Sequence, residues 1–223
     1  MTEMTLKEIA TELKKFDSAL IFSHARPDGD TLGSAMALKT ALINLGMEAD
    51  VVCASDIPEK YDIFPAFKTI KKPAEINKKY AAHVSVDISV ESMFGDSYNL
   101  YAKNANLFNI DHHVSNSRYA KYNFVRDNAA CCEIIYEFMQ CLGAEITSEI
   151  ADYLILGIIT DTGNFMHSNV TENTFFVASK LVAAGARIHD ITYRMFKDQT
   201  KVRALLFARV ISKMRFFLDD KLA

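Results

Sequence analysis

Several apolar, strand-like runs in this chain end directly at aspartate and histidine residues. Asp111, His112 and His113, for example, follow the apolar run 107–110. In an open parallel α/β sheet, the carboxyl ends of the strands gather at one edge, where ligands bind. We therefore expect residues that are remote in sequence to converge on one site. The four clusters are residues 24–30, Asp87, residues 111–113 and residues 161–163.

The order of the periodic segments predicts an α/β fold with a mostly parallel central sheet, helices on both faces and a helical C-terminal part. Alternating or continuous apolar runs predict the strands, and apolar residues at three- and four-residue spacing predict the helices. The expected strands are 18–23, 49–53, 82–88, 105–110 and 119–125. The expected helices are 5–16, 32–45, 130–142, 147–160, 171–184, 188–197 and 199–214, with a further strand opening at 215–223.

Composition narrows the classes of function. The net charge is −3, from 25 basic and 28 acidic residues, which argues against a protein that grips a long nucleic acid duplex. No apolar stretch is long enough to cross a bilayer, and the first residues do not resemble an export signal. The four cysteines lack paired metal-ligand spacing, so we expect reduced thiols and a cytoplasmic protein without a membrane partner.

The acid and histidine clusters predict a site for two divalent ions. Imidazole and carboxylate donors without a thiolate favour manganese over a structural zinc. The spacing of His24, Asp28 and Asp30 is typical of a ligand-bearing loop, which Pro27 stiffens and Gly29 allows to turn. Each cluster alone has a simpler interpretation: Pro-Asp-Gly is a common turn, and a single aspartate after a strand can cap a helix. Together they favour a two-metal hydrolase.

The motifs resemble those of the DHH phosphoesterase family. The resemblance covers about residues 18–190, and it lies in the branch that carries a DHHA1 domain. That branch includes oligoribonuclease/3′-phosphoadenosine-5′-phosphate phosphatases and cyclic-dinucleotide phosphodiesterases. Residues 23–34 resemble the first motif, 86–87 the second, 111–113 the third and 157–163 the fourth.

The resemblance implies a role for each matching residue. One manganese ion would be held by His24, Asp28 and Asp87, and Asp87 would also bind a second manganese ion, so that it bridges the two. Asp111 would lie beside the histidines and fix the tautomer of an imidazole, and His113 would face the scissile phosphate. Ser34 and His167 are further candidate substrate contacts. The second manganese ion would be held by Asp30, Asp87, His112 and Asp161.

The mechanism expected from two such ions is hydrolysis by a shared, bridging hydroxide in line with the leaving oxygen. The resemblance implies small substrates, namely short oligoribonucleotides or 3′,5′-bisphosphate nucleotides. Cyclic di-adenosine monophosphate and its linear dinucleotide remain an alternative. Pyrophosphate is a further alternative, because family II pyrophosphatases share the first motif, although the form of residues 160–165 favours the DHHA1 branch.

The chain departs from the family pattern in two places. Met93 stands where relatives often carry an arginine, and no two of the eight glycines are adjacent, so the Gly-Gly-Gly-His motif of the DHHA1 domain is absent. We therefore expect a DHH domain over residues 1–190, and a linker helix with the start of a missing DHHA1 domain over 191–223. A homodimer is compatible with the resemblance. An alternative of another class is a metal-binding module that is inactive without its DHHA1 domain.

Overall fold

The computed structural model describes residues 2–215 and contains one sheet in which every pair of neighbouring strands is parallel. The strand order is β1-β6-β5-β4-β2-β3. The strands β2, β4 and β5, which precede three of the four clusters, are therefore adjacent. The strands are β1 Thr2–Glu3, β2 Ser18–Phe22, β3 Glu48–Val52, β4 Ala82–Val86, β5 Leu107–Asp111 and β6 Tyr122–Val125.

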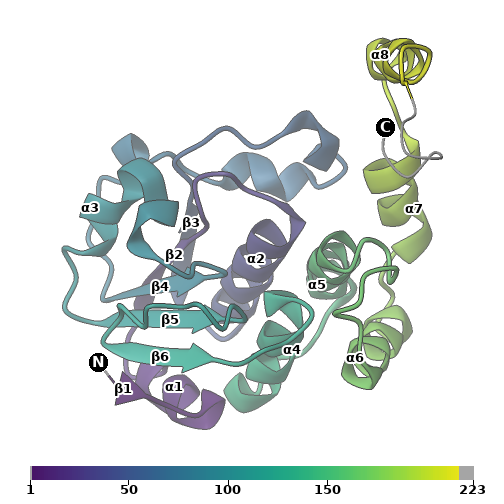
Figure 1. Ribbon diagram of the computed structural model, residues 1–223. Helices are drawn as coiled ribbons and strands as arrows, with labels where there is room; N and C mark the ends of the chain where they lie inside the picture. The colour runs from purple at the N-terminus through teal and green to yellow at the C-terminus, as the bar shows by residue number, and fades with distance from the viewer. Residues whose placement is uncertain (1, 216–223) are drawn as a thin grey trace.

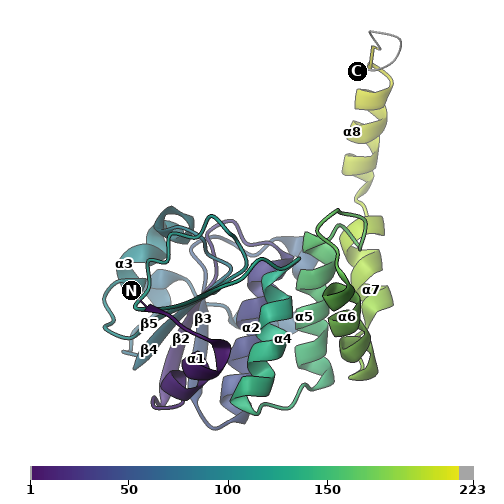
Figure 2. The same ribbon diagram turned by 60° about the horizontal axis from the view of Figure 1, so that its bottom comes forward.

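Helices cover both faces of this sheet (Figures 1 and 2). On one face lie α1, α2 and α4, with α5 packed beyond them against α2 and α4. The 3₁₀ helix Glu91–Ser97 and α3 lie on the opposite face, where Phe94 and Tyr101 pack together. The helices are α1 Leu6–Leu13, α2 Gly29–Asn44, α3 Tyr98–Tyr101, α4 Cys131–Leu142, α5 Ser148–Asp161, α6 Glu172–Ala183, α7 Ile188–Thr192 and α8 Lys201–Ile211. The predicted α/β architecture, with its helical C-terminal part, is confirmed.

Alternate side chains of the strands build two separate cores. In β2, Ile21 packs with the larger core under α2 and α4, whereas Phe22 packs with the smaller core under α3. Phe22 meets Tyr101 edge to face, with ring centroids 5.2 Å apart. Both cores are apolar and buried, so the sheet and its flanking helices form a rigid base for the loops at the strand ends.

Glycines bring α2 and α5 close together. A Cβ on Gly33 would overlap the backbone carbonyl of Tyr153. A Cβ on Gly157 would lie 2.5 Å from Asp30 Oδ1 and would also overlap the Cys132 sulfur. Only a glycine fits at these positions without a shift of the neighbouring helix. These glycines therefore allow the helices that carry the first and fourth motifs to pack in close contact.

Some boundaries differ from the sequence prediction. Helix α2 begins at Gly29 rather than at residue 32, because the Asp28 side chain caps it by accepting from the backbone N–H groups of Asp30 and Thr31. The short strand β1 was not predicted; it pairs with β6. The predicted strand at 215–223 lies almost entirely outside the described residues.

The C-terminal helix α8 projects away from the rest of the molecule (Figure 2). None of its residues is buried, and Leu205, Leu206 and Phe207 are each at least 60% exposed. Within the described residues, we find no helix with the length and apolar character that crossing a membrane requires.

Candidate metal centre

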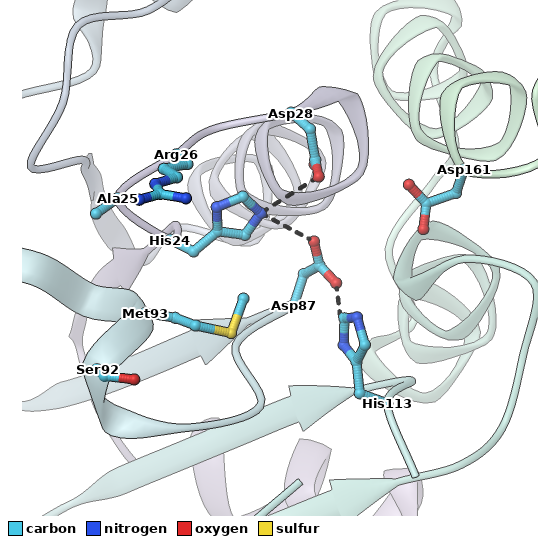
Figure 3. Close-up of a pocket in the computed structure, with 9 residues that line it drawn as sticks. All are labelled: His24, Ala25, Arg26, Asp28, Asp87, Ser92, Met93, His113 and Asp161. Carbon is cyan, nitrogen blue, oxygen red and sulfur yellow. Dashed lines mark ion pairs between the residues drawn. The ribbon is translucent and has the colours of Figure 1, made fainter. Parts of the chain in front are cut away.

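The predicted clusters meet at the carboxyl edge of the sheet, around a cleft of about 420 Å³. Three of them come from the ends of β2, β4 and β5, as expected from the strand-end argument. Asp161 differs, because it is the last residue of helix α5 rather than the end of a strand. Figure 3 shows the residues that line the cleft, which are His24, Ala25, Arg26, Asp28, Asp87, Ser92, Met93, His113 and Asp161.

In the loop after β2, the His24 imidazole and the Asp28 carboxylate face each other. One oxygen of Asp28 caps α2, and the other lies 3.4 Å from His24 Nε2. The Thr31 hydroxyl accepts from the backbone N–H of His24 and donates to the carbonyl of Val86, so it ties the end of β2 to the end of β4. A turn and a metal ligand were competing interpretations of Asp28, and the same side chain acts as a helix cap while its free oxygen faces His24.

Asp87 lies at the centre of the site. Its Oδ2 is 3.6 Å from His24 Nε2, and its Oδ1 is 3.4 Å from His112 Nε2. The residue is 3% exposed, and its backbone adopts a left-handed conformation with φ of 57°. Such a conformation is uncommon for residues other than glycine, although aspartate and asparagine tolerate it best. It turns the chain sharply at the end of β4 and directs the carboxylate between the two imidazoles.

A backbone carbonyl orients the His112 ring. His112 Nδ1 lies 2.9 Å from the carbonyl oxygen of Asn128, which can only accept, so Nδ1 carries the proton. Nε2 is the atom left to face Asp87 and Asp161. The Asn128 side chain in turn donates to Glu133 Oε2 at 2.7 Å, and Asn173 donates to the same oxygen at 2.9 Å. Glu133 is fully buried and thereby holds the loop that carries the carbonyl.

The amino terminus of α4 holds Asp30. The backbone N–H groups of Cys131 and Cys132 donate to its two carboxylate oxygens, at 2.6 and 2.9 Å. These are amides that a helix leaves free in its first turn, and the helix dipole favours an anion there. Asp30 is completely buried, with Oδ2 3.9 Å from His112 Nε2.

Asp161 approaches the same imidazole from α5, with Oδ2 3.6 Å from His112 Nε2. Its backbone carbonyl accepts from His167 Nδ1 and from the Asn169 side chain, at 3.1 and 3.3 Å. The Asn169 amide also donates to the carbonyl of Ala129, in the loop that precedes α4. The end of α5 is therefore linked to the loop that orients His112.

Asp111 orients the second histidine of the third motif. Its Oδ1 accepts from His113 Nδ1 at 2.8 Å, and its Oδ2 accepts from the Asn116 amide at 2.6 Å. Nδ1 also lies 3.7 Å from Asp87 Oδ1, the ion pair that Figure 3 marks, so Nε2 is the ring nitrogen left without these partners. The hydrogen bond and the charge of Asp111 raise the pKa of His113 above its usual value, although burial opposes this.

The pKa values of His24, His112 and Asp161 are all raised strongly. Burial favours the neutral ring of His24, but Asp28 and Asp87 outweigh it and raise its pKa to about 10. Burial likewise opposes protonation of His112, whose pKa is raised to about 10 mainly by Asp87. For Asp161, burial and the neighbouring carboxylates act together and raise the pKa to about 9. In a folded chain without an ion, protons thus compensate for the crowded negative charge.

The residues present fit divalent metal ions. Asp87 Oδ1 and His112 Nε2 are buried and have no hydrogen-bond partner among the described residues. Such atoms are costly to leave unpaired unless a ligand occupies the space between them. The ligand atoms of His24, Asp28 and Asp87 all lie within 4.8 Å of one another. The same holds for the group formed by Asp30, His112 and Asp161.

The two remaining candidate substrate contacts lie away from the lining of the cleft. Ser34 is completely buried in α2, with its hydroxyl 3.3 Å from the Cys132 sulfur. His167 is exposed and contacts the Asp161 carbonyl. Sequence reasoning missed Asn128 and Glu133, which act through a backbone carbonyl and a buried carboxylate. A signal for Glu133 was an acidic residue inside the apolar pattern of 130–142.

Comparison with known families adds an independent finding. The model of the DHH family, N-terminal domain, matches residues 18–158. A "Bifunctional oligoribonuclease and PAP phosphatase NrnA" from Thermus thermophilus is 32% identical, over 95% of this chain and 64% of the relative. The protein of the same name from Mycoplasma genitalium is 28% identical, over 100% of this chain and 76% of the relative. The chain thus spans a little under two thirds of the length of the Thermus relative.

Solved structures share the fold. An exopolyphosphatase-related protein from Bacteroides fragilis superposes with a TM-score of 0.89 at 20% identity, over 95% of this chain and 66% of the other. A putative family II inorganic pyrophosphatase from Methanococcus jannaschii superposes with a TM-score of 0.61 at 21% identity, over 79% of this chain and 61% of the other. At these identities the likeness concerns the fold alone.

Proposed function

The chain belongs to the DHH family, and on this premise we propose that it is a metal-dependent phosphoesterase that hydrolyses small nucleotide phosphoesters. Short oligoribonucleotides and 3′,5′-bisphosphate nucleotides are the proposed substrates, in line with the names of the Thermus and Mycoplasma relatives. The observation that carries the proposal is the pair of ligand groups that meet at Asp87 and His112. The four cysteines, all free, support the cytoplasmic setting.

In this proposal, one ion would be held by His24, Asp28 and Asp87, and manganese suits this nitrogen and oxygen donor set. Two bound ions would lower the pKa of a shared water and neutralise charge on the phosphate. The second ion would be held by Asp30, Asp87, His112 and Asp161.

The protein side chains contribute orientation and proton placement. Asp87 faces both ligand groups, with its two oxygens toward His24 and His112, so it would contribute to the binding of both ions. Asp111 accepts from His113 Nδ1 and favours the doubly protonated ring, in which the opposite nitrogen, Nε2, can donate to a phosphate oxygen in the cleft.

Hydrolysis by the chelator-treated protein, re-supplied with manganese, tests the proposal. A dinucleotide RNA, adenosine 3′,5′-bisphosphate, cyclic di-adenosine monophosphate and pyrophosphate would be compared side by side. We expect turnover of the first two that requires manganese. Turnover of only the cyclic dinucleotide or only pyrophosphate would overturn the proposed substrate class, and tight manganese binding without any turnover would favour a metal-binding module.

Asp87→Asn provides the matching variant, because asparagine keeps the shape of the side chain and tolerates the left-handed backbone. We expect turnover to fall by at least about 1,000-fold, the effect of losing a group that acts in the transition state. The control is Asp190→Asn, since Asp190 is exposed on α7. Comparable activity of the Asp87 variant and the wild type would contradict the assignment.

A further inference from the structure

Arg26 is the only arginine or lysine among the nine residues that line the cleft (Figure 3). Its side chain is exposed, and the described residues offer it no ion-pair partner within 4.0 Å. Other cleft residues with charge are arranged in pairs, such as His24 with Asp28. An unpaired guanidinium at the wall of an acidic cleft is therefore available to an anion that comes from outside.

The charge balance of the site indicates which anion this is. The four carboxylates of the two ligand groups, on Asp28, Asp30, Asp87 and Asp161, carry four negative charges when ionised. Two divalent ions carry four positive charges, so the loaded centre is close to neutral. A substrate with one phosphate can be bound by the ions alone. A substrate with a second phosphate brings up to two further negative charges, which need another cation.

The position of Arg26 separates it from the ion centre. In Figure 3, Arg26 lies on the His24 side of the pocket and Asp161 lies on the opposite side. A phosphate against Arg26 is thus a different group from a phosphate held between the two ligand groups. The Met93 side chain lies below Arg26 and His24 in the same view and offers an apolar surface at this wall of the cleft for the sugar of the substrate.

The backbone around Arg26 is held firmly. The N–H of Ala25 donates to the carbonyl of Met93 at 2.7 Å, and Pro27, which follows Arg26, is buried. Proline also restricts the backbone of the residue that precedes it. The base of the arginine side chain is therefore fixed, while its guanidinium remains free to form two parallel hydrogen bonds with a phosphate.

We propose that Arg26 binds a second, non-scissile phosphate of the substrate and gives this site a preference for nucleotides with two phosphate groups. The inference rests on the proposed phosphoesterase function and deepens it. It predicts that selectivity for bisphosphate nucleotides, rather than turnover in general, depends on this residue.

The test measures kcat/KM of the manganese-loaded protein for adenosine 3′,5′-bisphosphate and for the adenosine 3′- and 5′-monophosphates. In Arg26→Ala, we expect the ratio of bisphosphate to monophosphate kcat/KM to fall about tenfold, mainly through KM, as expected for losing a charge-assisted contact of about 1.4 kcal/mol. Arg26→Lys should retain part of the preference. Arg209→Ala, on exposed α8, is the control and should leave the ratio unchanged.

Equal losses for both substrate types in Arg26→Ala, or no loss for the bisphosphate, would overturn the inference. If the wild type hydrolyses none of these nucleotides, the proposed hydrolysis of bisphosphate nucleotides fails, and calorimetric titration of the loaded protein with the same nucleotides still decides the role of Arg26. Tighter binding of the bisphosphate that Arg26→Ala abolishes would support the phosphate subsite. Equal affinity of both proteins for the bisphosphate would refute it.

Discussion

Asp87 combines a buried carboxylate with a left-handed backbone, and this combination limits what can replace it. A longer or β-branched side chain would be strained at a φ of 57°, whereas asparagine would be accommodated. The charge can therefore be removed with little change in the backbone. Asp87→Asn thus separates an effect on ion binding from an effect on folding better than any change at the fully buried Asp30.

The same residues predict a characteristic pH dependence. His24 and His112 have pKa values raised to about 10, compared with 6.5 in the unfolded chain. The folded, ion-free protein therefore keeps these protons between pH 6.5 and about 10, while the unfolded chain loses them. Their contribution to stability is full below pH 6.5 and is lost as the pH rises through about 10. A metal ion must displace these protons, so its affinity rises with pH.

We expect the increase in melting temperature caused by manganese to be larger at about pH 8.5 than at about pH 6, because proton competition weakens as pH rises. Thermal unfolding of the loaded and the chelator-treated protein at several pH values measures it. His189→Gln, which changes a surface histidine, serves as the control. A manganese-induced shift that is constant over this range would be inconsistent with displaced histidine protons.

At the scale of the elements, the first turn of α4 is as important as the strand ends. Its N–H groups bind Asp30, and its Glu133 holds Asn128, whose carbonyl orients His112. One helix terminus thereby positions a ligand from the first motif and a ligand from the third. Residues that orient ligands in this way commonly change metal affinity when they are replaced.

Glu133→Ala should weaken manganese binding by about 10- to 100-fold, because the amides of Asn128 and Asn173 lose their shared acceptor. Glu133→Gln should restore most of this affinity, since one amide oxygen can take the place of Oε2. Calorimetric titration with manganese measures both, with the exposed Glu145→Ala as the control. If Glu133→Ala binds manganese like the wild type, the Asn128 carbonyl orients His112 without the hydrogen bond to Glu133.

The contact between α2 and α5 yields a second prediction. Gly157→Ala should cost about 1–3 kcal/mol of unfolding free energy, the usual cost of overpacking. It should also weaken manganese binding, because the new methyl group meets Asp30 as well as the Cys132 sulfur. In the double variant with Cys132→Ala, we expect stability to recover in part while the affinity stays low. Full recovery of both would show that Asp30 is not displaced.

At the scale of the whole molecule, α8 stands apart from the domain that holds the site. The described part of this helix has no buried residue and several exposed apolar ones. We propose that α8 lies outside the folding unit, while the predicted boundary at residue 190 stays a prediction. Arg194 still contacts the backbone of Glu59 and Lys60, so the segment just before α8 belongs to the domain.

A protein that ends at residue 200 should therefore unfold with a free energy within about 0.5 kcal/mol of the full chain, as is usual when only exposed residues change. Its manganese affinity should be unchanged. Denaturant unfolding and titration of both proteins check this expectation. A large loss of stability or of ion affinity would place residues 201–223 within the folding unit.

The sequence was sufficient to predict the parallel sheet and the meeting of the clusters, because strand periodicity and acidic strand ends are local patterns. It predicted Asp161 as a ligand candidate through a motif, but the strand-end argument was wrong for this residue, which ends a helix. Asn128 could not be predicted, since it acts through a backbone carbonyl that any residue carries. The role of Glu133 depends on a tertiary contact with a loop, which no spacing in the sequence reveals.

The placement of Asp161 has a mechanical consequence. His24, Asp87 and His112 are anchored to adjacent strands of one sheet, whereas Asp161 reaches them from a helix in the outer layer. A small sliding of α5 along α2 would leave these three side chains in place and would change only the distance from the Asp161 carboxylate to them. Three of the ligands are thus held rigidly by the sheet, whereas the distance from Asp161 to them depends on how α5 packs against α2 at the glycine contact.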